Sequence, residues 1–296
     1  MKVAVFTLEW AIGDKDAGKL VREFLKEQEI SKAALTDIKS NGKILLNGEN
    51  VTVRKVLEKN DVLVVEFPPE RRSSTLPGED IPLDIMYEDD YLIVVNKGPG
   101  MNTIPSREHP TGSLANAIIG YYEKKGFPST FHVVTRLDRN TTGLVLIAKH
   151  RHIHHLFSKY HSLVNRIYEG FAAGVFSNPS GTIEEPIRRN PDSIIEREVH
   201  PSGQYACTHY EVLRQFDQFA HVKFRLETGR THQIRVHLSY IGHPLLGDDL
   251  YGGPLDSIDR QALHCKEISF IHPIKKEKCI FEAPLPADME AILKNG

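Results

Sequence analysis

The chain has 296 residues, 40% of them hydrophobic and 26% charged, which is typical of a globular protein of about two domains. No apolar run approaches the ~18 residues that a membrane helix needs, and the N-terminal stretch lacks the apolar segment of a secretory signal. The three cysteines, Cys207, Cys265 and Cys279, show no CxxC spacing, which disfavours a disulfide framework or a zinc site and favours a reducing cytoplasm.

The first 70 residues predict a small module of two helices and short strands. The first helix should have an apolar face formed by Leu20, Val21, Phe24 and Leu25. A second helix is expected to begin after Ser31 and to end in a left-handed turn at Gly42. Asn47-Gly48 is typical of a hairpin turn, and residues 62–67 are typical of a strand. We therefore predict a compact α/β module over residues 1–70.

Residues 71–82 are rich in Ser, Pro, Gly and charged residues, so we interpret them as a linker to a larger domain at 83–296. The strands predicted in that domain are 91–95, 143–149, 166–174 and 206–213, and the helices are 114–125, 153–163 and 231–241. Strands do not alternate regularly with helices, and no glycine-rich phosphate loop occurs. We predict an α+β fold with a mixed, largely antiparallel sheet.

The segment VTRLDRNTTGLVLIAK contains one acid, Asp138, between Arg136 and Arg139, just before an apolar strand. Neighbouring guanidinium groups favour an ionised carboxylate. Such an acid is better suited to attack an electrophile or to stabilise positive charge than to release a proton. From His132 to Gly170 there are six Lys and Arg residues against two acids, a net charge of +4, which predicts a basic surface around Asp138. The commoner role for such an acid is a surface ion pair.

Two further segments contain candidate site residues. In RIYEGFAAG, strand alternation places Arg166, Tyr168 and Gly170 on one face, and the small residue leaves space in which a planar ring could stack. An ordinary core tyrosine is the alternative. In GRTHQIRVHL, a helix capped by Thr231 would place Arg235 at the edge of its buried face, where it needs an anionic partner. A solvated arginine is equally compatible with that pattern.

Seven sequence blocks, in register over nearly the whole chain, resemble the RluA-type pseudouridine synthases, which isomerise uridine in ribosomal or transfer RNA. The blocks are YEDDYLIVVNKGPG, TRLDRNTTGLVLIAK, RIYEG, TGRTHQIRVHL, GDDLYGG, ALHCKEISFIHP and FEAPLP. SKAALTDIKSNGKILLNG resembles the S-four RNA-binding domain that many members carry, although residues 1–70 are nearly neutral, with 11 basic and 12 acidic residues. The resemblance implies a pseudouridine synthase fold and an isomerase that acts on RNA.

The resemblance also implies roles for individual residues. Asp138 would be the catalytic aspartate, Tyr168 the active-site tyrosine and Arg235 the basic residue paired with the aspartate. Arg136 would enter the RNA stack where the target uridine has flipped out. The other expected RNA-binding residues are Arg139, Lys149, Arg166 and Arg230. The ionised aspartate could attack C1′ or act at C2′ of the ribose, and both routes stay open. We expect a cytoplasmic monomer that needs no metal ion and no cofactor.

A cluster of histidines follows the apolar strand but lacks the acid or cysteine that would complete a set of metal ligands. Its members are His150, His152, His154, His155 and His161. We interpret this segment as a polar helix that faces RNA. The acid pair Asp248-Asp249 resembles a metal site in composition only, because adjacent residues of an extended chain point apart, so it predicts a turn.

Two positions depart from the family pattern. Thr135 stands where the family usually has His, and MNTIPS (101–106) replaces a more hydrophobic segment. Two other function classes compete with the isomerase. An RNA-binding assembly factor without activity is disfavoured because Asp138, Tyr168 and Arg235 are all present. An Asp-dependent hydrolase or phosphotransferase is disfavoured because neither a second placed acid nor a phosphate loop occurs.

Overall fold

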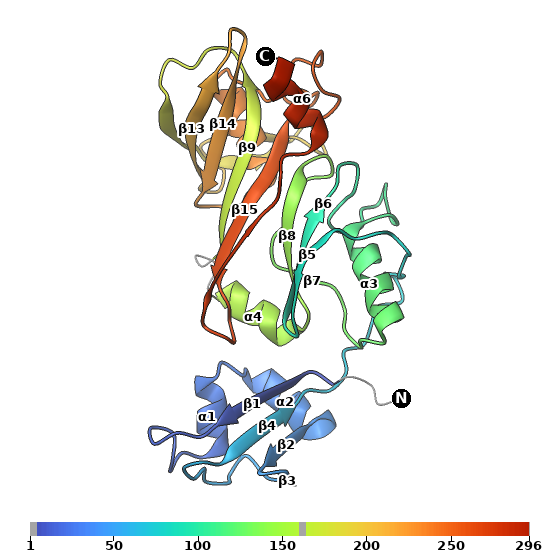
Figure 1. Cartoon of the computed structure of the whole chain (residues 1–296), viewed down its shortest axis with the longest axis vertical. Coiled ribbons are helices and arrows are strands. Elements are labelled where there is room, and N and C mark those ends of the chain that lie inside the picture. Colours follow the sequence, from blue (N-terminus) through green and yellow to red (C-terminus); the bar gives the residue numbers. More distant parts are fainter. Residues whose placement is uncertain (1–4, 160–163, 296) are drawn as a thin grey trace.

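The computed structural model describes residues 5–159 and 164–295. Figure 1 shows two parts connected by an extended segment. The smaller, N-terminal part ends with β4 (Val62–Glu66), and the larger part begins with β5 (Ile85–Glu88). Within the two described ranges, every helix is too short or too polar to cross a membrane.

The N-terminal part is a four-stranded antiparallel sheet with two helices; the sequence indicates the helices and the short strands, apart from β1. Its elements are β1 (Thr7–Ala11), α1 (Val21–Glu27), α2 (Lys32–Asn41), β2 (Lys43–Leu46), β3 (Glu49–Asn50) and β4, in the sheet order β1-β4-β2-β3. Ser31 caps α2, because its Oγ accepts a hydrogen bond from the Ala34 N–H at 3.1 Å. Asn47 and Gly48 both have positive φ and form the expected hairpin turn.

The end of α2 differs from the expectation of a left-handed turn. Gly42 adopts an extended conformation, with φ at −114°. A Cβ atom at this position would collide with the carbonyl oxygen of Glu66 on β4. Glycine is required here by the close approach of β4, and the prediction of a left-handed residue is wrong.

The larger part is built on one ten-stranded sheet, counted over the described residues. Its strands are β5, β6 (Leu92–Lys97), β7 (His132–Val133), β8 (Thr142–Ala148), β9 (Asn165–Ala173), β10 (Ser180–Glu184), β13 (Cys207–Gln215), β14 (Phe219–Leu226), β15 (Leu263–Ile271) and β16 (Lys278–Glu282). The remaining elements are α3 (Leu114–Lys125), α4 (Arg151–Lys159), α5 (Gln233–Tyr240), α6 (Ala287–Asn295) and the hairpin of β11 (Ile187–Arg189) and β12 (Arg197–Val199).

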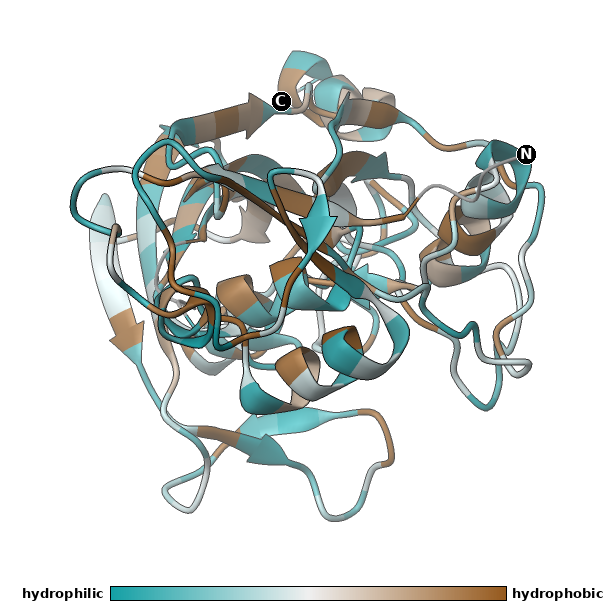
Figure 2. Cartoon of the chain, turned by 90° about the horizontal axis from the view of Figure 1, so that it is seen from below, coloured by the Kyte–Doolittle hydropathy of each residue, from teal (hydrophilic) through white to brown (hydrophobic). Residues whose placement is uncertain are grey.

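The order along the sheet is β10-β13-β14-β9-β15-β8-β6-β5, with β16 added to β15 and β7 added to β8. The β8–β15 pair is parallel, whereas the other pairs are antiparallel. The prediction of an α+β fold with a mixed, largely antiparallel sheet is therefore confirmed. Helices in the hydropathy view carry brown and teal residues on the same ribbon, as amphipathic helices do when one face packs on a core (Figure 2).

Strand β8 lies at the centre of this core, and all seven of its residues are buried. It shares one apolar cluster with residues of α3 and α4. Gly143 has φ at 108°, and a Cβ atom there would collide with the backbone of Cys265 on β15. Only glycine therefore lets β8 enter the sheet at this point, directly after the turn that contains Asp138.

The expected linker, residues 71–82, is ordered against α3. The Arg72 guanidinium donates hydrogen bonds to the carbonyl oxygens of Phe127 and Ser129 at 2.6 and 3.1 Å. The Glu79 N–H bonds to the carbonyl oxygen of Asn116 on α3 at 2.9 Å. The segment between the two parts therefore follows a defined path along the larger part.

Helix α4 lies at the end of the larger part that faces the N-terminal part (Figure 1). The ring of Phe6 stacks on His150 with 4.1 Å between centroids, and Phe67 contacts both His150 and His152. Burial lowers the pKa of His150 to about 3 and that of His152 to about 4. The prediction of an RNA-facing helix is thus wrong for these histidines, and His161 lies outside the described residues.

Glu70, which follows the last strand of the N-terminal part, forms hydrogen bonds with the larger part. Its carboxylate lies 2.6 Å from Nε2 of His132, and it accepts the Arg151 N–H at 2.9 Å and the Ser129 hydroxyl at 3.1 Å. Burial disfavours the charged form, but these bonds outweigh burial and lower the pKa of Glu70 to about 2. Glu70 is therefore a buried ionised group whose partners all come from the larger part.

Candidate active site

Asp138 lies in the turn that leads into β8. Its carbonyl oxygen accepts the N–H of Thr141 at 3.2 Å. The preceding residue, Leu137, is held by Thr103, whose Oγ1 accepts the Leu137 N–H at 3.1 Å and donates to the Leu137 carbonyl at 2.7 Å. Thr103 belongs to the segment 101–106 that departs from the family pattern. This segment fixes the backbone next to the candidate catalytic acid.

Lys97 supports the same turn from the end of β6. Its side chain is buried, and Nζ donates to the carbonyl oxygens of Gly98, Met101 and Arg139 at 2.9, 3.0 and 3.1 Å. Burial lowers the pKa of Lys97 to about 7, although the negative charge of Asp138 opposes this effect. The sequence reasoning missed Lys97. The signal available was a lysine two residues after the apolar run LIVV, at the end of the strand.

Arg235 lies between two carboxylates. Its Nη1 is 3.4 Å from Oδ2 of Asp138. Its Nε and Nη2 bind the two oxygens of Asp248 at 2.7 and 2.8 Å. Asp248 is fully buried and Arg235 is 6% exposed. The acid pair at 248–249 lies in a turn, as expected, but the sequence reasoning did not foresee that Asp248 points inward and orients Arg235.

Tyr251 and His232 connect Asp248 back to Asp138. The Tyr251 ring lies 5.0 Å from Cζ of Arg235, and its hydroxyl is 2.8 Å from Nδ1 of His232. Nε2 of His232 is in turn 3.9 Å from Oδ2 of Asp138. His232, with φ at 59°, is the N-cap of α5, so the prediction that Thr231 caps this helix is wrong. Burial lowers the pKa of His232 and favours its neutral form.

A cavity of about 60 Å³ opens in front of Asp138 and adjoins a groove of about 540 Å³. Tyr168 lines the cavity but is only 4% exposed, and burial raises the pKa of its hydroxyl. The expected open space above Gly170 is absent, because a Cβ there would lie 3.2 Å from the side chains of Leu245 and Phe224. Room for a ring therefore exists beside Asp138 and not over Gly170.

Three of the predicted RNA-binding residues surround this cavity and groove. Arg136, Arg166 and Arg230 line both. Arg136 and Arg230 are exposed, and Arg166 is half-buried against the backbone of Gly229. The Nε of Arg166 is buried and has no hydrogen-bond partner within the described ranges. The mouth of the cavity is therefore cationic.

The other two predicted RNA-binding residues are placed differently. Arg139 points away from Asp138, toward the Gly100 carbonyl at 3.1 Å and Nε2 of His109 at 2.7 Å. Lys149 lies at the opposite end of β8 and is buried, with Nζ 2.8 Å from Glu88. The expected basic surface around the acid is wrong for Lys149, because a seven-residue strand separates it from the turn.

Thr135 has a structural contact at the position where the family usually has His. Its Oγ1 accepts the Leu146 N–H at 2.9 Å, so its side chain ties the approach to the turn to strand β8. The residue is buried, although its edge reaches the groove. The substitution therefore replaces an imidazole by a side chain that contacts the backbone.

Comparison with known proteins places these residues in a family context. The sequence model of RNA pseudouridylate synthases matches residues 91–240. The chain is 52% identical over 277 residues to YjbO of Bacillus subtilis, named an uncharacterized RNA pseudouridine synthase, with 93% of this chain and 98% of that protein covered. It is 34% identical over 290 residues to ribosomal large subunit pseudouridine synthase D of Escherichia coli, with 93% and 84% covered.

Solved structures show the same fold. The human RNA pseudouridylate synthase domain containing 1 aligns with a TM-score of 0.58 at 23% identity, over 74% of this chain and 96% of that chain. The region matched by the sequence model contains Asp138, Tyr168 and Arg235, and it ends before Asp248.

Proposed function

Because the chain belongs to the RluA-type family of RNA pseudouridine synthases, which are isomerases, we propose that Asp138 carries out the conversion of uridine to pseudouridine in ribosomal or transfer RNA. The observation that carries this proposal is the position of Asp138. Its carboxylate borders a cavity with a cationic mouth and lies 3.4 Å from a buried arginine.

The isomerisation needs a group that acts on the ribose. The bond from C1′ to N1 breaks, the uracil turns over, and C1′ bonds to C5; C5 loses a proton and N1 gains one, so atoms and electrons balance. Asp138 either attacks C1′ or removes the C2′ proton. Neither route requires a metal ion, a cofactor or an oxidant, so the proposal includes none. Deuterium at C2′ should slow turnover only if Asp138 acts there.

Arg235 acts as the positioning residue for the carboxylate. A guanidinium 3.4 Å away attracts one carboxylate oxygen and fixes its direction. Asp248 holds that guanidinium in place with two hydrogen bonds. Arg235 can therefore orient Asp138 through its longer contact, while its two shorter hydrogen bonds are made to Asp248.

The target uridine must leave the RNA stack to reach Asp138. Flipping a base costs a few kcal/mol. Stacking on an aromatic ring recovers about 1–3 kcal/mol per base. In this proposal Tyr168 provides that ring, which is supported by its position in the lining of the cavity together with Asp138. Its hydroxyl stays protonated because burial raises its pKa, so it can donate a hydrogen bond to the base.

Arg136, Arg166 and Arg230 hold the RNA backbone at the mouth of the cavity, and Arg136 fills the gap that the flipped base leaves. The buried, unpartnered Nε of Arg166 supports this role, since a phosphate oxygen would satisfy it. We also propose that residues 1–70 form a separate RNA-binding module. We further propose that the protein acts as a monomer in the cytoplasm.

Mapping of pseudouridines tests the function directly. In a strain that lacks this gene, carbodiimide-stop sequencing should show the loss of specific sites in ribosomal or transfer RNA. Wild-type protein should restore these sites, and Asp138→Asn should not. If the protein were an RNA-binding assembly factor without activity, the deletion strain would lose no pseudouridine, and wild type and Asp138→Asn would both restore its growth.

A further inference from the structure

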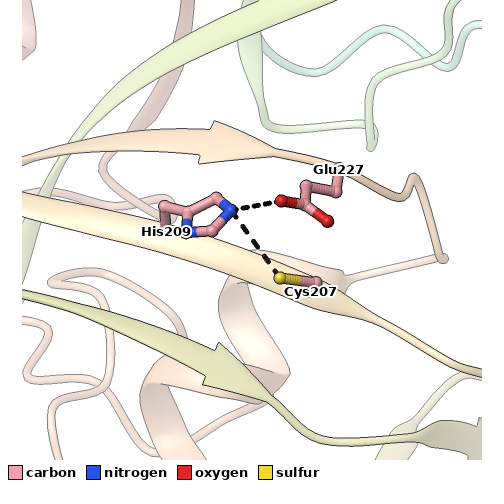
Figure 3. A group of neighbouring side chains, drawn as sticks. All are labelled: Cys207, His209 and Glu227. Carbon is pink, nitrogen blue, oxygen red and sulfur yellow. Dashed lines mark hydrogen bonds and ion pairs between the residues drawn. The ribbon is translucent and has the colours of Figure 1, made fainter. Parts of the chain in front are cut away.

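Cys207, His209 and Glu227 form a cluster at the edge of the groove, which Glu227 lines and which Cys207 and His209 do not (Figure 3). Nε2 of His209 lies 2.7 Å from Oε1 of Glu227 and 3.7 Å from Sγ of Cys207. Cys207 and His209 are two residues apart on β13, so their side chains share one face of the sheet. Glu227 directly follows β14, the neighbouring strand, and its N–H bonds to the Cys207 carbonyl at 3.3 Å.

We propose that these three side chains bind a divalent cation of the Zn²⁺ class, with water at the fourth position. Thiolate, imidazole and carboxylate are the three side-chain ligand types that zinc prefers. The three ligand atoms lie within 4.8 Å of one another. Ligands at ~2.0–2.3 Å from one tetrahedral ion are about 3–4 Å apart, and the observed 3.7 Å between sulfur and nitrogen matches that spacing. The 2.7 Å between Nε2 of His209 and Oε1 of Glu227 is a hydrogen-bond distance, so the exposed Glu227 side chain must move back when the ion binds.

The surroundings of the ligands fit this role. Nδ1 of His209 lies 2.8 Å from Oγ1 of Thr182 on the adjacent strand, a contact that orients the ring with Nε2 toward the site. The backbone of Cys207 is held on both sides, by Thr228 Oγ1 at 3.0 Å and by Gln233 Nε2 at 3.0 Å. One ligand is therefore rigid and another is oriented before any ion binds.

The site has an open side through which an ion and water can enter. Cys207 is 3% exposed, whereas the side chains of His209 and Glu227 are 26% and 46% exposed. When the ion binds, the Cys207 thiol loses its proton to solvent, and any proton that His209 shares with Glu227 is also released. The resulting thiolate, neutral imidazole and carboxylate leave the fourth coordination position to water.

A simple His–Glu ion pair is the competing interpretation. The same sheet contains such a pair between β14 and β9, since His221 Nε2 lies 2.9 Å from Oε2 of Glu169. Among the residues that the structure describes, however, the cluster at Cys207 is the single group of three or more potential ligands. The Cys207 thiol distinguishes this cluster from the His221–Glu169 pair, so the test must address that thiol.

A bound ion would join the ends of β13 and β14 at the point where the chain turns toward the cavity. Glu227 is followed by Thr228, Gly229 and Arg230, all of which line the groove. The ion would therefore act structurally, by holding the turn that carries Arg230. The sequence predicts no zinc site because its cysteines lack CxxC spacing. That criterion does not detect ligands two residues apart on a strand, such as Cys207 and His209, which alternation places on one face.

Cobalt substitution in the full chain tests the site without reference to catalysis. Protein treated with a chelator and then titrated with Co²⁺ should develop a thiolate-to-cobalt charge-transfer band that Zn²⁺ abolishes. Cys207→Ser should eliminate the band, and His209→Ala should weaken Zn²⁺ binding at least ~10-fold in competition with a chromophoric chelator. Zn²⁺ should also raise the Tm of the wild type.

Two matched variants complete the experiment. Cys279→Ser removes a partly exposed cysteine outside the cluster, and His221→Ala breaks the His221–Glu169 pair; both variants should keep the band. If the wild type shows no band, or if the band survives Cys207→Ser, the proposal is wrong. His209 is part-exposed, so His209→Ala stays informative even if Cys207→Ser fails to fold, and unchanged Zn²⁺ affinity in that variant would equally overturn the site.

Discussion

Arg235 binds Asp248 with two nitrogens, at 2.7 and 2.8 Å, and reaches Asp138 with the third, at 3.4 Å. The orientation of the proposed catalytic carboxylate therefore depends on a second, fully buried acid that does not line the cavity. A charge buried beside a well-oriented partner is stable as a pair, but either member alone is costly. This dependence yields the first prediction.

Asp248→Asn should impair both stability and turnover. The amide cannot neutralise Arg235, and breaking a buried ion pair costs about 3–5 kcal/mol of unfolding free energy. Urea denaturation should show this loss, and release of tritium from C5 of uridine in RNA should show slower turnover. Asp249→Asn, at the exposed neighbouring position, is the control and should behave as wild type. Equal stability of Asp248→Asn and Asp249→Asn would contradict the role assigned to Asp248.

Asp138→Asn should abolish turnover and leave RNA affinity within a few-fold of wild type. The substitution keeps the shape of the side chain and removes its charge and its nucleophilicity. The tritium-release assay measures turnover, and filter binding measures affinity. Residual turnover above about a thousandth of wild type would exclude Asp138 as the catalytic carboxylate.

Arg235→Met should reduce turnover nearly as much as Asp138→Asn, because both act on one carboxylate. Arg235→Lys should retain part of the activity, although an ammonium cannot bind Asp248 with two parallel hydrogen bonds. The Arg235→Met and Asp138→Asn double variant should be no slower than Asp138→Asn alone. Additive losses in this cycle would show that Arg235 acts independently of Asp138.

Tyr168→Phe should separate stacking from hydrogen bonding. The phenyl ring can still stack, but it loses the protonated hydroxyl, and removal of a positioned proton donor typically costs about 100-fold or more in turnover. Tyr168→Ala should additionally weaken binding of the flipped base. Single-turnover kinetics with saturating enzyme distinguish the two effects. If both variants turned over as fast as wild type, Tyr168 would serve only the core.

Arg136→Ala should lower RNA affinity and reduce the slope of log affinity against log salt by about 1, as loss of one phosphate contact does. Lys149→Met is the matched comparison, since Lys149 is buried beside Glu88 at the other end of β8. It should destabilise the fold without changing the salt slope. An unchanged slope for Arg136→Ala would show that Arg136 does not contact an RNA phosphate.

Glu70→Gln should reduce stability at pH 7 by about 2–3 kcal/mol, because the folded carboxylate has a pKa near 2 and the ordinary value is 4.5. A group whose pKa is depressed on folding stabilises the protein above its unfolded pKa. The difference between wild type and variant should therefore disappear as the pH falls from 4.5 to about 2. Urea unfolding at a series of pH values measures it.

The same contacts predict where the N-terminal module can be removed. A chain that begins at residue 70 keeps the partner of His132 and of the Arg151 N–H, whereas a chain that begins at residue 76 does not. We expect both to keep catalytic activity and the longer one to be more stable. If neither chain folds, the two parts share one hydrophobic interior.

Local pattern determined most of the architecture of this protein. Periodicity and turn residues predicted α3, β8 and β9 to within a residue or so, because their apolar sets repeat along a continuous segment. Asp138, Tyr168 and Arg235 could likewise be nominated from sequence, because motifs place them on a turn, a strand and a helix. Strand β15 was not predicted; its pairing with β9 has a register shift between Cys265 and Glu267, which interrupts the alternation along the strand.

Only the tertiary structure decided which charges meet. Asp138 and Arg235 are 97 positions apart in the sequence. Asp248 binds Arg235 from a turn, and sequence spacing does not show in which direction the Asp248 side chain points. Lys149 lies close to Asp138 in sequence, yet the length of β8 carries it to the other end of the sheet. Contacts of this kind depend on strand order and on which face a side chain takes, and those are set by the packing of the whole chain.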